Sequence, residues 1–430
     1  MFDAPYLLVC DDKGNIFEDE SLRLVGRESS KIKLLNWNDL IPLPKGSDFF
    51  FLPKRKPVGF NPKSKQIELS NKGYAVAAFV APGHTQTALA AFIKENNAPV
   101  LPLYAYTAVG WYKGTFYTSA LRVDPDIRQD IDQFHQPIVV SATKRFLKKY
   151  PQNRLLKHLV HCATVYLCPA ARNFFLNRWE APLPTSPTCN SKCRGCISYQ
   201  PKKSGFCSTQ YRINFIPTPE EIAEIAIDHL ETAPNPIVSF GQGCEGEPLM
   251  VADVIAESIK LIRKKTSKGV INLNTNGSKP DKIFKLIEVG LESARISINS
   301  FQPDLYKWYY LPVNYTFDDV ILSIQLLRQH KRWVSINYFV HPGFTNKPEE
   351  IESLLVAIEK LKFNMIQWRN LNIDPDYIGE PLNINENSSL TSIKELIFLI
   401  KERYPWLYNG YFNPGKNIIE KYNLRPLQGN

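Results

Sequence analysis

SPTCNSKCRGC, the stretch at residues 186–196, decides the fold, because it places Cys189, Cys193 and Cys196 within eight residues in C-x3-C-x2-C spacing. The glycine, asparagine and serine between the cysteines let a short loop wrap around a compact cofactor. Thiolates are the usual ligands of iron–sulfur clusters, and a four-iron cluster takes four ligands. Three cysteines therefore leave one iron free to bind a further molecule, as the open position of a catalytic zinc site does.

Zinc is the alternative metal for the same three thiols. A structural zinc site is closed by a fourth cysteine or histidine, and Cys207 is the one candidate soon after the triplet. A non-catalytic zinc or iron–sulfur binding module would hold metal without forming a product. The sequence therefore leaves two classes open, an enzyme and a metal-binding module.

The cysteine spacing resembles the signature of the radical SAM superfamily, over roughly residues 180–375. The resemblance implies a [4Fe-4S] cluster whose open iron binds S-adenosylmethionine and cleaves it to methionine and a 5'-deoxyadenosyl radical. That radical takes a hydrogen atom from a substrate. It also implies an oxygen-sensitive protein and an electron donor such as flavodoxin or ferredoxin. The superfamily usually has an aromatic residue before the third cysteine, where this chain has Gly195, and Tyr199 is a candidate replacement.

Strand-like and helical segments alternate from about residue 180, which predicts an α/β fold with a parallel sheet or barrel. Thr218 and Glu221 frame a capping box that marks the start of one helix. Besides a strand just before the triplet, strands are expected near 236–241, 270–276, 293–299, 333–340 and 364–372. Together with the resemblance, six such βα units predict a partial (β/α)6 TIM-like barrel of the radical SAM type.

Polar residues recur at every second position of these strands, so each strand presents one polar and one apolar face. Parallel strands buried on both faces are usually apolar throughout, so a polar inner face indicates a lumen that holds a polar ligand. Polar residues that line this lumen and face either cofactor or substrate include Gln367 and Arg369. The predicted cofactor-binding residues are Gly246, Glu247, Asn274, Asn276, Arg295, Ser297, Asn299 and Asn337.

The resemblance gives some of these residues a role. Gly246-Glu247-Pro248 is similar to the glycine and glutamate motif that receives the amino group of S-adenosylmethionine. Ser297 and Asn299 would meet the ribose or the methionyl carboxylate, with Arg295 as the partner of the carboxylate.

Further cysteines lie outside the triplet. Cys244, beside the glycine and glutamate motif, is a candidate catalytic hydrogen donor, and the alternative is a small buried apolar residue. A second metal site from His158, His161, Cys162 and Cys168 is the alternative to core packing, which we expect because His161 and Cys162 are adjacent and point apart on a helix. No cysteine follows residue 244, so the resemblance does not extend to the peptide-modifying branch with auxiliary clusters.

The first part of the chain has a different sequence pattern. Short β-like runs predict a β-rich or α+β accessory domain at 1–145, with a hairpin that turns near Lys113-Gly114. A loop at 80–87 is a candidate cover for the open end of the barrel, where barrel active sites lie. The rest divides into a helical linker at 146–179, a radical SAM core at 180–380, and a C-terminal helix and tail at 381–430.

Length, composition and charge limit the class of protein, its location and its substrate. A chain of 430 residues with 44% hydrophobic and 22% charged residues is typical of a globular protein of two or three domains. It has no apolar run near the roughly 18 residues of a membrane span, no signal peptide, and too few cysteines for a disulfide framework, so we expect a cytoplasmic protein. The net charge of +10 permits an RNA substrate, but we favour an exposed lysine-rich surface, and a small-molecule substrate is the other option.

Overall fold

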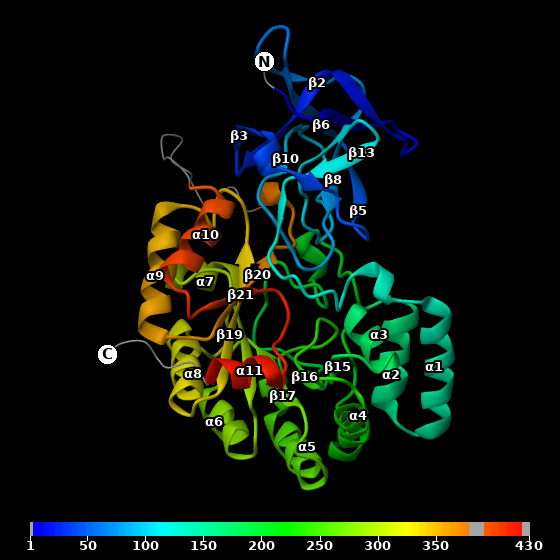
Figure 1. Ribbon diagram of the computed structural model, residues 1–430, viewed down its shortest axis with the longest axis vertical. Helices are drawn as coiled ribbons and strands as arrows, with labels where there is room; N and C mark the ends of the chain where they lie inside the picture. The colour runs from blue at the N-terminus through cyan, green and yellow to red at the C-terminus, as the bar shows by residue number, and fades with distance from the viewer. Residues whose placement is uncertain (1–2, 378–390, 424–430) are drawn as a thin grey trace.

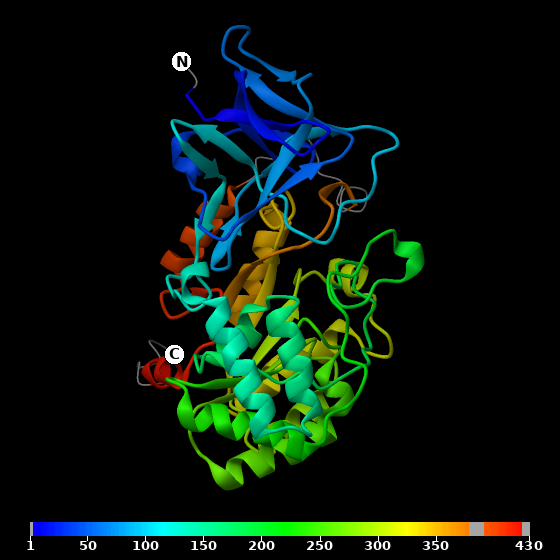
Figure 2. The ribbon, with the colours of Figure 1, turned by 90° about the vertical axis from the view of Figure 1, so that its right-hand side faces the viewer.

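The structure of the chain, a computed structural model, describes residues 3–377 and 391–423. An α/β barrel forms one end of the molecule, and a β-rich N-terminal region, residues 3–122, forms the other end (Figure 1). The view at 90° shows the helices of residues 136–175 standing against the side of the barrel (Figure 2). The predicted fold class is confirmed.

Seven parallel strands curl into the sheet of the barrel, in the order of the chain from β15 to β21. Six of them coincide with the predicted strands. The seventh, β21, was expected to be part of the tail, and it becomes a strand because Met365 and Gln367 of β20 pair with Tyr408 and Gly410. The strands are β15 Glu180–Pro182, β16 Ile237–Phe240, β17 Val270–Thr275, β18 Ser293–Ile298, β19 Trp333–Val340, β20 Met365–Asn370 and β21 Tyr408–Gly410.

Helices follow the strands and cover the outer face of the sheet (Figure 1). The predicted capping box of Thr218 and Glu221 is present at the start of α4, and Thr316 forms another with Asp319 at the start of α8. The helices are α4 Pro219–Thr232, α5 Ala252–Lys265, α6 Pro280–Glu288, α7 Pro303–Tyr310, α8 Phe317–Gln329, α9 Pro348–Leu361, α10 Ile393–Arg403 and α11 Lys416–Asn423.

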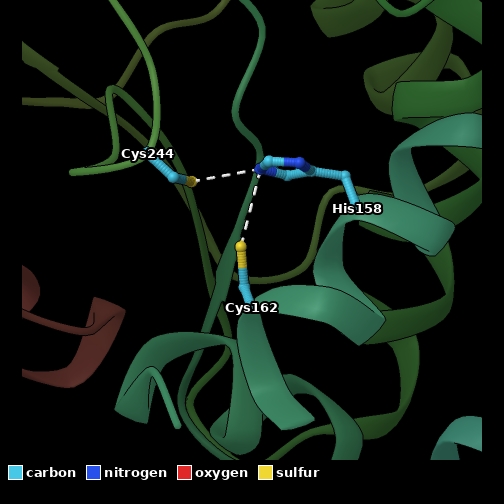
Figure 3. A group of neighbouring side chains, drawn as sticks. All are labelled: His158, Cys162 and Cys244. Carbon is cyan, nitrogen blue, oxygen red and sulfur yellow. Dashed lines mark hydrogen bonds between the residues drawn. The ribbon is translucent and has the colours of Figure 1, made fainter. Parts of the chain in front are cut away.

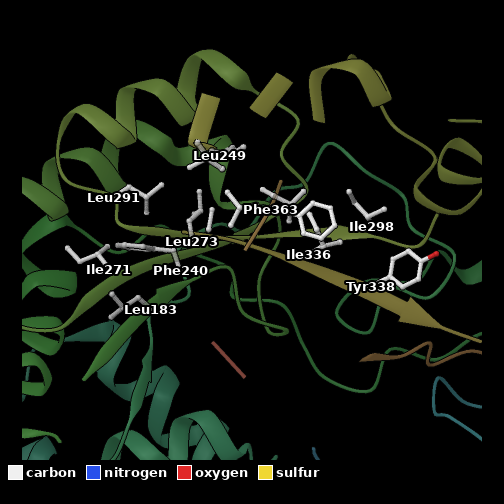
Figure 4. Packing of buried hydrophobic residues seen from close by; sticks show 14 of the residues in the cluster. Leu183, Phe240, Leu249, Ile271, Leu273, Leu291, Ile298, Ile336, Tyr338 and Phe363 are labelled. Atoms are coloured by element: carbon white, nitrogen blue, oxygen red, sulfur yellow. The ribbon is translucent and has the colours of Figure 1, made fainter. Parts of the chain in front are cut away.

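The apolar face of the sheet forms the main core under these helices. Figure 4 shows Phe240, Leu273 and Ile336, from three different strands, packed among other buried apolar side chains. Each of the three is fully buried. Because neighbouring residues on a strand point to opposite faces, the alternating polar residues point into the lumen, as the sequence predicted.

The N-terminal region is an antiparallel sheet of twelve strands, with β9 and β14 forming a separate pair. The predicted hairpin at Lys113-Gly114 is confirmed, because Tyr112 pairs with Thr115 and both turn residues have positive φ. The strands are β1 Tyr6–Cys10, β2 Ile16–Glu28, β3 Lys31–Leu34, β4 Ile41–Pro42, β5 Asp48–Leu52, β6 Arg55–Asn61, β7 Gln66–Leu69, β8 Tyr74–Phe79, β9 His84–Gln86, β10 Leu89–Ala90, β11 Phe92–Lys94, β12 Val109–Tyr112, β13 Thr115–Thr118 and β14 Ala120–Arg122.

Strand β9 fixes the N-terminal region to the mouth of the barrel. Thr85 Oγ1 donates to the carbonyl of Trp368 at 2.6 Å, and the amide of Gln86 donates to Asn370 Oδ1 at 2.8 Å. Both acceptors belong to β20, close to its C-terminal end. The segment that the sequence indicated as a cover is therefore fastened to the strand ends where barrel active sites lie.

Three helices join the two regions: α1 Gln136–Lys149, α2 Arg154–Thr164 and α3 Pro169–Phe175. The predicted domain boundary after residue 145 falls inside α1. Asn153 Nδ2 donates to the carbonyl of Glu221 in α4 at 2.8 Å, so these helices form part of the barrel wall. The predicted boundary at residue 380 lies outside the described residues.

Within residues 3–377 and 391–423, the structure contains no helix of the length and apolar character that a membrane crossing needs.

A buried histidine makes the stability of the barrel depend on pH. Burial lowers the pKa of His229 to about 4, and its Nε2 lies 2.7 Å from the carbonyl of Trp179. The unfolded chain binds this proton below pH 6.5 and the folded chain does not, so stability present above pH 6.5 is lost as the pH falls toward 4.

We predict that the free energy of unfolding falls by about 1.4 kcal/mol per pH unit in this window because of His229. Denaturant titrations of His229→Gln should show a correspondingly flatter pH dependence. The exposed His330 provides the control, and His330→Gln should keep the wild-type slope. Equal slopes for His229→Gln and the wild type would contradict the prediction.

Candidate active site

The three cysteines of the triplet lie on the loop that follows β15 and line a cavity of about 350 Å³. The cavity opens among the C-terminal ends of the barrel strands, where ligands bind in such folds. Burial raises the pKa of Cys189 to about 11 and that of Cys193 well above its ordinary value. Bound metal would reverse this preference for the neutral thiol, because metal ligation deprotonates cysteine.

The spacing of the three sulfur atoms bears on which metal they hold. One zinc ion with Zn–S bonds of about 2.3 Å keeps its sulfur ligands within about 4.6 Å of one another. The triplet does not form a group of ligand atoms within 4.8 Å, and Cys207 is exposed. The thiols thus fit a multi-iron cluster better than a single ion. Arg212 Nη2 lies 3.7 Å from Cys196 Sγ, and it adds a positive charge beside this ligand.

Glu245 fastens the loop before the cysteines to the turn after β16. One carboxylate oxygen accepts from the amides of Thr185 and Ser186 at 2.8 and 2.9 Å. The other oxygen accepts from the amides of Gly241 and Gln242 at 2.8 and 2.7 Å. Burial raises the pKa of Glu245, and these hydrogen bonds oppose that rise. Its side chain is buried at the border of the cavity and both of its oxygens accept from backbone amides, so it positions the cluster loop.

The glycine and glutamate motif lies directly against this loop. A Cβ atom on Gly246 would come within 1.9 Å of the carbonyl oxygen of Thr188, so only glycine allows the close approach. The amide of Glu247 then donates to the same oxygen at 2.8 Å. Burial raises the pKa of Glu247 to about 7, and its carboxylate accepts from Thr275 Oγ1 and the amide of Asn276. Both motif residues line the cavity.

Polar side chains of three further strands meet at matching positions of the sheet. The register places Asn274 beside Arg295, and Ser297 beside Asn337. Arg295 Nε and Asn337 Oδ1 are buried and lack a hydrogen-bond partner among the described residues, as does the hydroxyl of Tyr310. All of these side chains line the cavity. Unsatisfied buried groups of this kind are costly, so the cavity suits a polar ligand that pairs with them.

Gly195 leaves space that an aromatic side chain fills. A Cβ atom on Gly195 would lie 2.7 Å from the hydroxyl of Tyr309, a residue at the end of α7 that lines the cavity. Tyr199, the replacement that the sequence indicated, is 55% exposed and carries Arg212 over its ring. Tyr309 therefore takes the place beside the cluster loop, although nothing in the sequence near the cysteines marks it.

The structure brings most of the predicted site residues together. Asn299, Gln367 and Cys244 are outside the cavity lining in the part of the chain that the structure describes. Their roles in the site stay predictions. The predicted residues that line the cavity are Cys189, Cys193, Cys196, Gly246, Glu247, Asn274, Asn276, Arg295, Ser297, Asn337 and Arg369.

The side-chain amides of Asn274 and Asn276 form hydrogen bonds with other residues around the cavity. Asn276 Nδ2 donates to Asn190 Oδ1 at 2.9 Å, and Asn274 Nδ2 donates to the carbonyl of Gly241 at 2.9 Å. Both side chains thus position the cluster loop and the turn after β16, and they stay candidates for cofactor contacts.

Cys244 turns away from the cavity toward α2. Its Sγ lies 3.3 Å from His158 Nε2, and the same nitrogen lies 3.5 Å from Cys162 Sγ (Figure 3). The sequence placed His158 and Cys162 among the candidates for a second metal site, and a spacing of four residues puts both on one helix face. It did not indicate that Cys244 joins them. His161 is exposed on α2 and packs edge-on against Tyr166.

Residues 183–355 match the family model of the radical SAM superfamily, so the chain contains a radical SAM domain, which supports its being an enzyme. Members of this superfamily use a [4Fe-4S] cluster and S-adenosylmethionine.

Solved structures similar to this chain include methylornithine synthase, with 15% identity over 66% of this chain and 77% of that chain and a TM-score of 0.38. A maturase of the [FeFe]-hydrogenase is 17% identical over 65% of this chain and 64% of that chain, with a TM-score of 0.39. SuiB of Streptococcus suis, bound to S-adenosylmethionine, is 13% identical over 62% of this chain and 59% of that chain, with a TM-score of 0.38. The chain spans less than two thirds of the last two. A comparison with curated proteins found no match. We infer no substrate from these similarities.

We predict that Glu245→Gln destabilises the protein by about 2–4 kcal/mol, because an amide nitrogen would face backbone donors inside the protein. Denaturant unfolding of the iron-free chain measures the change. Glu231→Gln is the matched control, since Glu231 forms an exposed pair with Lys268 and the variant should keep nearly the wild-type stability. Equal stability of the two variants would show that Glu245 does not hold the loop.

Proposed function

We propose that this protein is a radical SAM enzyme in which Cys189, Cys193 and Cys196 hold the cluster, and that it acts on a small anionic substrate inside the barrel. One observation carries the proposal: the three thiols and several unpaired buried polar groups face one cavity. When bound, the cluster and S-adenosylmethionine supply a 5'-deoxyadenosyl radical that abstracts hydrogen. The protein's own residues bind and orient the reactants and limit access of water.

Each group of S-adenosylmethionine has its own proposed partner among the residues around the cavity. Glu247 is the acceptor for its amino group, since a carboxylate pairs with an ammonium group, and Gly246 allows the close approach. Arg295 is the partner of its carboxylate. Ser297 and Asn337 are the ribose contacts, because Asn337 Oδ1 is unpaired and its Nδ2 donates to Ser297 Oγ at 3.3 Å.

Arg369 supports an anionic substrate. Its guanidinium lies 3.9 Å from the ring centroid of Tyr411 and donates to the Tyr411 carbonyl at 3.1 Å. Burial and the neighbouring Arg369 lower the pKa of Arg295 to about 10. Within the described residues, neither arginine forms an ion pair with a carboxylate. The carboxylate of the bound cofactor forms an ion pair with one of the two arginines. An anionic group on the substrate forms an ion pair with the other.

The segments that border the cavity favour a small molecule over RNA. Phe79 and Val80 of the N-terminal region line it together with Tyr411 from the C-terminal part. Segments from three parts of the chain thus border the space above the cysteines, which suits a compact substrate better than a folded polynucleotide.

Three exposed lysines form a surface for electron delivery on and after the cluster loop. Lys192 lies within the triplet, and Lys202 and Lys203 follow it, with all three exposed. Positive charge at this place would attract an acidic carrier protein and speed its association. A flavodoxin or ferredoxin in the cytoplasm is the proposed donor.

The first test of the proposal is product formation. Anaerobically reconstituted protein should contain about four iron atoms per chain and, once reduced, convert S-adenosylmethionine to 5'-deoxyadenosine and methionine. A variant with Cys189, Cys193 and Cys196 replaced by alanine should lose both the iron and the product, measured by metal analysis and chromatography. Cys207→Ala is the control and should keep both. Zinc in place of iron at the triplet, or product from the triple variant, would refute the enzyme assignment.

The second test distinguishes the roles of Arg295 and Arg369. Arg295→Ala should weaken binding of S-adenosylmethionine by about 10- to 100-fold, the loss expected for a charged hydrogen bond of about 1.5–3 kcal/mol. Arg369→Ala should leave this affinity within about twofold, because its cation serves the substrate. Anaerobic equilibrium dialysis against the cluster-loaded protein measures both. Arg295→Lys, which keeps the charge, should lie between the wild type and the alanine variant. A loss confined to Arg369→Ala would reverse the assignment.

A further inference from the structure

A second group of metal-binding side chains lies outside the cavity. His158 and Cys162 occupy one face of α2, and Cys244 comes from the turn after β16 (Figure 3). His158 Nε2 lies 3.3 Å from Cys244 Sγ and 3.5 Å from Cys162 Sγ. All three ligand atoms lie within 4.8 Å of one another. Figure 3 shows the imidazole directed between the two sulfur atoms.

These distances match the coordination shell of one zinc ion. Zn–S bonds of about 2.3 Å and Zn–N bonds of about 2.0–2.1 Å, at tetrahedral angles, place a nitrogen and a sulfur ligand about 3.5 Å apart. The same geometry separates two sulfur ligands by about 3.8 Å. Both measured nitrogen to sulfur distances fall close to the first value. The main triplet, by contrast, does not gather its sulfurs this closely.

Hydrogen bonding alone accounts poorly for the arrangement. Nε2 of a neutral histidine is either a donor or an acceptor, and a single S–H is a weak donor. One nitrogen placed between two sulfurs therefore leaves at least one contact poorly satisfied. A metal ion satisfies all three groups together, because each of them contributes a lone pair to it.

Burial points to the same ligand. Cys162 is 3% exposed and Cys244 is 7% exposed, and His158 is half-buried. Two thiolates in such surroundings need a positive charge beside them, and a divalent ion balances both charges. Soft thiolate ligands with an imidazole select zinc among the common divalent ions.

We propose that His158 Nε2, Cys162 Sγ and Cys244 Sγ bind one zinc ion, with the fourth position left to water or another external ligand. The ion ties α2 to the turn that carries Glu245, one residue after Cys244. It therefore positions the glycine and glutamate motif from outside the cavity. Cys244 is then a metal-bound thiolate and not a hydrogen donor. The site stands apart from the proposed function, because none of its ligands belongs to the iron-binding triplet.

Metal analysis of the full chain tests the proposal. Protein reconstituted anaerobically with iron and sulfide, then given zinc and dialysed against a chelator, should retain one zinc per chain beside its iron. Replacing Cys162 and Cys244 together by serine should remove the zinc and leave the iron. The alanine variant of the three cluster cysteines should show the opposite loss. Cys10→Ala alters a buried cysteine of β1 and should keep both metals.

A measurement on the wild-type chain guards against variants that fail to fold. X-ray absorption at the zinc edge observes zinc alone, whatever the iron content. It should give two sulfur neighbours at about 2.3 Å and at least one nitrogen neighbour at about 2.0 Å. A shell of oxygen and nitrogen only, no zinc retained against the chelator, or zinc unaffected in the double serine variant would overturn the proposal. Loss of iron and product with zinc intact would count against the proposed function alone.

Discussion

The carboxylate of Glu245 is the contact on which the arrangement of the site depends. A loop that carries three cysteines has no regular secondary structure to fix it, and its position relative to the barrel must come from a long-range contact. Glu245 supplies this contact by accepting backbone hydrogen bonds from both sides, from Thr185 and Ser186 and from Gly241 and Gln242. A buried carboxylate is costly by itself, and several amide donors offset that cost.

The second constraint is the division of each barrel strand into two faces. Apolar residues such as Leu273 and Ile336 pack under the helices, while Asn274, Arg295 and Asn337 face inward. A lumen lined by polar side chains is stable only if it is small, hydrogen-bonded or filled by a polar ligand. The N-terminal region contributes to this by covering the strand ends, and the hydrogen bond from Thr85 to the Trp368 carbonyl holds it there. Attachment of the N-terminal region and binding of polar ligands thus depend on the same barrel sheet.

A zinc ion at the outer turn and an iron–sulfur cluster at the inner loop would serve different purposes in one domain. Zinc has no redox chemistry, so it suits a position where geometry alone matters. The turn after β16 connects the two places, because Cys244 faces outward and its neighbour Glu245 points to the cluster loop. The turn is therefore held from both sides, and it presents Gly246 and Glu247 to the cavity between these two anchors.

The sequence by itself determined the features that short-range spacing encodes: three thiols within eight residues, strands with polar residues at every second position, and a hairpin at Lys113-Gly114. These patterns reflect local backbone geometry, so they are readable without a structure. Only the tertiary structure decided that Tyr309 fills the space at Gly195, that Cys244 meets His158, and that β21 completes the sheet. Each of these contacts joins residues tens of positions apart, or more than a hundred, and nothing in the local sequence specifies the partner, because folding alone brings the two segments together.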